Sequence, residues 1–136
     1  MAETAEKVNI RHPIDAHNIT IHKDPFHPNA YIISLPLDSD PSYVWQTLFE
    51  QTLSGSLDFW DRKVLVVARE LKLATTQDGL EEKLKWLEEI VNATNRRVVE
   101  HNRKVRLEKE AKKSRRADEE SIRQVLSKWV TARAPG

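Results

Sequence analysis

The stretch from Asp78 to about Lys113 is the part of the chain that most limits how it can fold. It contains no proline, and its only glycine lies at its start, so it can form a helix of roughly 50 Å at ~1.5 Å per residue. A seam of mostly apolar side chains runs through it at alternating intervals of four and three: Leu80, Leu84, Leu87, Val91, Thr94, Val98, His101 and Val105. This spacing is typical of a helix that packs along its length, as in a coiled coil.

The composition indicates one soluble globular domain. The chain has 136 residues, of which 32% are charged, and a chain of this length can bury about two-thirds of its unfolded surface. The lack of cysteine excludes disulfides and thiolate metal sites and favours a cytoplasmic location. No signal peptide is visible, and no apolar run approaches the ~18 residues that cross a bilayer. We therefore expect no membrane partner.

Four short segments are predicted to be strands, because they are β-branched or alternate between apolar and polar side chains. They comprise residues 19–22, 31–35, 64–68 and 71–74. The third is apolar throughout, which predicts an inner strand. Arg69-Glu70 is the expected turn of a second hairpin, and one longer strand with a bulge is the alternative.

A first helix is expected to begin at Asp40 and Pro41 and to end at Gly55, since these residues suit the cap, the first turn and the stop of a helix. The resulting order is β-β-α-β-β-α. It predicts an α+β fold with a small mixed or antiparallel sheet and both helices on one face. The body is expected to span residues 1–95, with an irregular arm over residues 1–17.

Residues 96–136 are predicted to form a basic helical extension and then a further amphipathic helix. Asp118 can cap this last helix after a turn near residue 116. Large apolar side chains follow at helical spacing, at Ile122, Val125, Leu126, Trp129 and Val130. Folding back onto the extension would give them poor cover, because it offers only Val98, Val105 and Leu107 there.

This excess of apolar surface predicts self-association, with a dimer favoured. The expected oligomer interface combines the seam with the last helix: Leu84, Leu87, Val91, Val98, Val105, Ile122, Val125, Leu126 and Trp129. Docking of the last helix on the chain's own sheet, or disorder, are the alternatives.

Basic side chains gather in residues 96–116, which hold ten Lys and Arg against three acids. Such a run can neutralise phosphates of a nucleic acid or meet another anionic partner. The candidate contacts are Arg96, Arg97, Arg103, Lys104, Arg106, Lys109, Lys112, Lys113, Arg115 and Arg116. However, these charges circle the helix, no aromatic residue lies among them, and pairs such as Glu108–Lys112 stabilise a solvated helix. A solvated helix is therefore the simpler interpretation.

Histidine recurs every five residues, at His12, His17, His22 and His27, which raises the question of a metal site. Residues i and i+5 of a strand point to opposite sides, and two of these histidines precede proline. Ordinary loop and edge-strand histidines are therefore expected, with no metal and no cofactor.

Enzyme signatures are weak in this sequence. It has no glycine-rich phosphate loop and no nucleophile elbow. Asp38 and Asp40 are expected to cap a helix, while Asp58 and Asp61 flank Phe59-Trp60, a pair expected to plug one end of the sheet. We expect a non-catalytic interaction or assembly module. Nucleic-acid binding through residues 96–116 is the first alternative, and a metal-dependent enzyme at the N-terminal histidines is the second.

Overall fold

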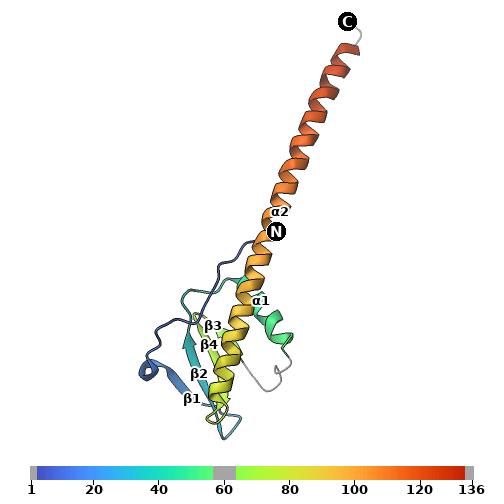
Figure 1. Ribbon diagram of the computed structural model, residues 1–136. Coiled ribbons are helices and arrows are strands. Elements are labelled where there is room, and N and C mark those ends of the chain that lie inside the picture. The colour runs from blue at the N-terminus through green and yellow to red at the C-terminus, as the bar shows by residue number, and fades with distance from the viewer. Residues whose placement is uncertain (1–2, 57–63, 134–136) are drawn as a thin grey trace.

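The computed structural model describes residues 3–56 and 64–133, which form a small sheet, a short helix and one very long helix (Figure 1). A 3-10 turn precedes the first strand. In chain order the elements are η1 (Ala16–Asn18), β1 (Thr20–Lys23), β2 (Ala30–Pro36), α1 (Tyr43–Ser54), β3 (Val64–Val67), β4 (Glu70–Thr76) and α2 (Leu80–Arg133). The expected α+β class is confirmed.

The four strands form one antiparallel sheet in the order β1-β2-β4-β3. The prediction of an inner strand at residues 64–68 is therefore wrong, because β3 lies at the edge. Its apolar run is buried on one face only, and Leu65 is 67% exposed on the other. The inner strands are β2 and β4, and Leu71 and Leu73 of β4 are fully buried. The continuous apolar run thus predicted a strand correctly, but it did not predict the position of that strand within the sheet.

A tight turn joins β3 to β4, so the hairpin prediction is confirmed and the bulge alternative is not. Val67 pairs with Glu70, which leaves Ala68 and Arg69 as the two loop residues, one position earlier than expected. Ala68 has a positive φ of 52°. A positive φ at the first loop position is the conformation that a type II′ hairpin requires, and glycine normally supplies it.

The cap of helix α1 lies two residues after the expected one. The Ser42 hydroxyl, and not Asp40, accepts a hydrogen bond of 3.2 Å from the Trp45 backbone N–H. Serine caps as well as aspartate does, so both residues fitted the rule and only the structure selects one. Gly55 ends the helix as expected, with its N–H donating to the Gln51 carbonyl.

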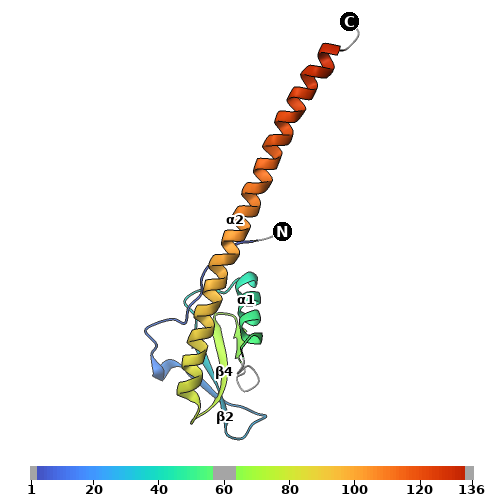
Figure 2. The same cartoon turned by 45° about the vertical axis from the view of Figure 1, so that its right-hand side comes forward.

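Both helices cover one face of the sheet, and the core lies between them and the strands (Figures 1 and 2). Trp45 and Phe49 of α1 stack with ring centroids 5.0 Å apart and are almost completely buried. They meet Leu87 and Val91 of α2 and the inward side chains of β2 and β4 in one apolar cluster.

Helix α2 is one continuous helix of 54 residues, about 80 Å long at ~1.5 Å per residue. The expected turn near residue 116 and the separate last helix beginning at Asp118 are therefore wrong. Neither glycine nor proline occurs between Leu80 and Arg133, so a cap-like residue alone does not break the helix. The buried contacts of α2 continue past residue 95 to Val105.

Replacing Ala68 by Gly should stabilise the protein by about 0.5–1 kcal/mol, because glycine adopts a positive φ without the Cβ clash that alanine has there. Chemical denaturation measures the difference in unfolding free energy. Arg69→Gly is the matched control, since Arg69 has no positive φ and should gain nothing. Equal effects of the two substitutions would contradict this account of the turn.

Candidate functional site

The C-terminal half of α2 leaves the body and extends alone into solvent (Figures 1 and 2). Val105 is the last buried residue of the helix, at 3% exposure. Every residue from Arg106 to Ala132 is exposed. We call residues 106–132 the projecting segment. Helices in proteins gain most of their stability from tertiary packing, and the described residues provide none for this segment.

Five large apolar side chains form one stripe near the end of the projecting segment. They are 52–68% exposed and lie within about 140° of the helix circumference at ~100° per residue. This tip stripe consists of Ile122, Val125, Leu126, Trp129 and Val130. Scattered apolar residues on a surface need no explanation, but a contiguous stripe of five is a candidate interaction site.

The other half of the predicted oligomer interface is occupied by the chain itself. Leu87, Val91, Val98 and Val105 are each at most 3% exposed, and Leu84 packs against the same core. Side chains buried this completely offer no surface to another molecule. Leu84 is partly buried, and the residues of the predicted interface that are exposed all belong to the tip stripe.

The N-terminal arm covers this part of α2, and the sequence analysis missed that contact. Asn102 accepts a hydrogen bond of 2.9 Å from the Ala5 N–H and donates one of 2.8 Å to the Ala5 carbonyl. Asn95 pairs in the same way with Val8, at 3.0 and 2.9 Å. Each carboxamide thereby satisfies both backbone groups of one arm residue.

The spacing of the two asparagines matches the spacing of the arm. Seven residues of α-helix rise about 10.5 Å, and three residues of extended chain span about 10 Å. The arm runs antiparallel to α2, with Ala5 at Asn102 and Val8 at Asn95. The sequence feature that could have predicted this contact is the pair of asparagines seven residues apart beside the apolar seam.

Asn95 also joins the arm to α1. Its side-chain oxygen accepts a hydrogen bond of 3.0 Å from the Trp45 indole N–H, and its amide group donates to the Asn9 side chain. Asn95 is 7% exposed and Trp45 is fully buried. This one side chain therefore holds three segments of the core together.

The ten basic candidates are all exposed, but they do not gather on one face. Four lie beside the body and six on the projecting segment. Arg103 forms an ion pair of 3.3 Å with Glu100, and exposed pairs of this kind contribute little stability. Along the described part of α2, the structure thus presents these charges as a positively charged rod.

The four N-terminal histidines are dispersed. His12 lies 3.9 Å from Glu88 of α2, and His27 lies 3.9 Å from Asp24. His17 belongs to η1 and His22 to β1. Within residues 3–56 and 64–133, no three His, Cys, Asp or Glu side chains come close enough to hold a metal ion.

The acidic candidates have structural contacts. Asp38 accepts a hydrogen bond of 3.0 Å from the Asn9 N–H through its carboxylate, and its carbonyl accepts one from Arg69. Asp40 lies 3.8 Å from the same arginine. Asp58, Asp61 and the Phe59-Trp60 pair lie outside the residues that the structure describes.

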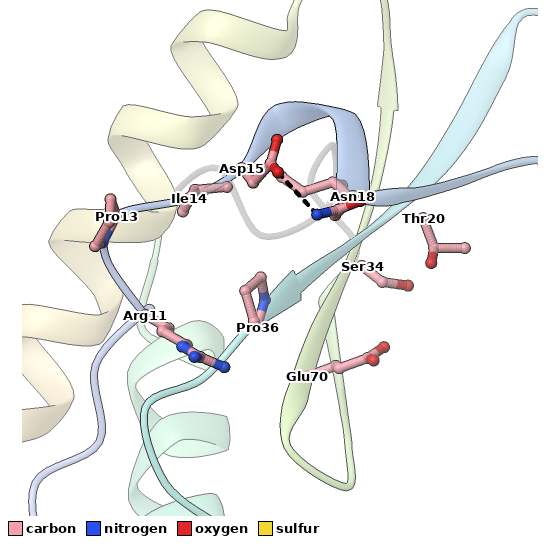
Figure 3. A pocket seen from close by; sticks show the side chains of 10 residues that line it. Arg11, Pro13, Ile14, Asp15, Asn18, Thr20, Ser34, Pro36 and Glu70 are labelled. Carbon is pink, nitrogen blue, oxygen red and sulfur yellow. Dashed lines mark hydrogen bonds between the residues drawn. The ribbon is translucent and has the colours of Figure 1, made fainter.

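A polar cavity of about 330 Å³ lies between the loop after the arm and the uncovered face of the sheet. Figure 3 shows Arg11 and Glu70 on either side of Pro36, with Asp15 bonded to Asn18 above them. A second cavity of about 340 Å³ on the same face is apolar and includes Phe26 and Leu65. Neither cavity brings together an acid, a base and a nucleophile in a way that suggests catalysis.

The chain matches no protein-family model, no curated protein and no solved structure in the three comparisons made. In addition, none of the helices that the structure describes is both long and apolar enough to cross a membrane. The chain's own geometry is therefore the basis for any functional proposal.

Replacing Asn95 by Ala should destabilise the protein by about 2–4 kcal/mol, because buried backbone groups of Val8 and the Trp45 indole lose their partner. Asn102→Ala should cost less, about 1–2 kcal/mol, since its surroundings are only partly buried. Asn92→Ala is the control, an exposed asparagine on the same helix, and should change stability by less than about 0.5 kcal/mol. Denaturant titration provides all three values. A loss for Asn92→Ala equal to that for Asn95→Ala would contradict the role assigned to the arm.

Proposed function

We propose that this chain is a non-catalytic assembly module that forms a homo-oligomer, in first place a dimer, through the end of α2. The observation that carries the proposal is the tip stripe, which stands on a helix far from any cover that the described part of the chain provides. The body supplies a base for this helix, because the arm, α1 and the sheet all pack against the first half of α2. The projecting segment then presents the stripe to a second copy.

The expected affinity follows from the exposed side chains. Complete burial of a large apolar side chain contributes about 1.5–3 kcal/mol, and each stripe residue is about half exposed, so ~1 kcal/mol each is a fair value. Ten such side chains in two copies contribute about 10 kcal/mol, against an association cost of about 4–15 kcal/mol. The net gain is at most about 6 kcal/mol, so we expect a weak dimer with a Kd no tighter than about 40 μM.

Leu126→Asp should abolish this dimer, since it places a charge in the centre of the tip stripe. Sedimentation equilibrium over a series of concentrations measures the change. Leu107→Asp is the matched control: it is the same substitution on the same helix, at an exposed leucine outside the stripe, and it should leave the dimer intact. Wild-type protein that remains a monomer at every concentration would reject the proposal.

The second candidate function is nucleic-acid binding by the basic residues 96–116. The observation in its favour is that all ten cationic side chains are exposed. Binding of this type should be strong at low salt and should weaken steeply as salt rises, because it depends on the release of counterions.

Titration of duplex DNA and RNA at two salt concentrations tests this alternative. Lys112→Gln with Lys113→Gln should weaken binding several-fold, whereas Lys23→Gln with Lys85→Gln, which removes the same charge from the body, should not. Absence of binding at low salt would reject the alternative.

A further inference from the structure

The apolar seam of α2 continues in register into the tip stripe, but four charged residues interrupt it. Counting on from Val105 by the same alternation of three and four gives Glu108, Lys112, Arg115 and Glu119, and then Ile122, Leu126 and Trp129. All four charged side chains are exposed. A second helix that follows this seam therefore meets charge between the body and the tip stripe.

These charged positions disfavour a parallel pair of helices. In a parallel, in-register pair each seam residue faces its own copy. Glu108, Lys112, Arg115 and Glu119 would then form four successive layers of like charges inside the helix contact. Like charges that face each other across an interface oppose association. A straight helix cannot bring its tip stripe together in this orientation without also bringing these layers close.

An antiparallel pair avoids the four layers. If the two-fold axis passes near Leu126, the middle of the tip stripe, the overlap covers only about residues 119–133. Glu108, Lys112 and Arg115 of both copies then lie outside it. Residues whose numbers add up to about 252 face each other, so that Ile122 of one copy lies opposite Val130 of the other.

The net charges at the two ends of the stripe also favour this orientation. Asp118, Glu119 and Glu120 precede the stripe, whereas Lys128 lies near its end. An antiparallel overlap brings the acidic end of one copy towards the basic end of the other, and a parallel overlap brings the two acidic ends together. Charge complementarity of this kind selects orientation more than it adds affinity.

We propose that two copies of this chain join antiparallel at the ends of α2, with their bodies at opposite ends of the assembly. The inference rests on the proposed function and specifies its partner, a second copy, and the geometry of the contact. Each copy contributes Ile122, Leu126 and Trp129 to one continuous apolar interface that is related to itself by a two-fold axis.

Single-cysteine crosslinking tests the orientation, because the chain has no cysteine of its own. Asp118→Cys and Ala132→Cys are prepared separately and treated with a short bismaleimide, alone and mixed. In the antiparallel pair residues 118 and 132 of different copies lie within about 3 Å of each other along the axis, while the two copies of residue 118 are about 24 Å apart at ~1.5 Å per residue. We expect at least a tenfold higher yield of crosslinked dimer in the mixture than with either variant alone.

The control is the same mixture with Leu126→Asp added to both variants, which should lose the crosslink. Efficient crosslinking of Asp118→Cys to itself would show a parallel dimer and overturn this inference, while the proposed self-association would stand. The inference would also be overturned if sedimentation shows a dimer but the mixture gives no higher yield of crosslinked dimer than either variant alone. A chain that stays monomeric would remove both the orientation and the proposed function, because the tip stripe would then not be covered by a second copy.

Discussion

The uninterrupted backbone of α2 determines how the rest of the molecule is arranged. A single helix that contains no glycine or proline continues as long as its local interactions allow, whether or not anything packs beside it. Here the first half forms the core with the sheet and α1, and the second half has no cover from the described residues. Because both halves belong to one rigid rod, the body fixes the direction in which the tip stripe points.

The arm explains why the seam of α2 is covered beside the body, so that its accessible apolar side chains lie at the far end of the helix. Val98 and Val105 would lie at the edge of the body, yet they are 1% and 3% exposed. Asn95 and Asn102 hold the arm by its backbone, so the contact at these two positions depends on an extended conformation more than on particular arm side chains. The buried seam and the tip stripe have the same heptad spacing, but only the second remains open to a partner.

The sequence predicted an element correctly where a single local rule determined it. Prediction failed where two rules competed, or where a contact joins residues far apart in the sequence. The strands, the hairpin and the helix end at Gly55 follow from local patterns. Asp118 resembled a helix cap, but the surrounding residues favour helix strongly enough to continue it. The contact between Asn95 and Val8 joins residues 87 positions apart, and no local pattern predicts such a pair. The exposed stripe was predictable because it depends only on helical spacing.

The charged stretch between the body and the stripe acquires a physical role in this arrangement. Residues 106–119 are unsuitable as a helix–helix contact, because their seam positions carry charge, yet they include the i,i+4 pair Glu108–Lys112, which favours the helical state. They can therefore hold the stripe away from the body without attracting a partner along their own length. From Val105 to Leu126 the helix rises about 32 Å at ~1.5 Å per residue, so an antiparallel pair would separate the two bodies by about 63 Å. A flexible linker of equal length would sample many distances, whereas a continuous helix sets one, and this is the property that an assembly module with a defined spacing requires.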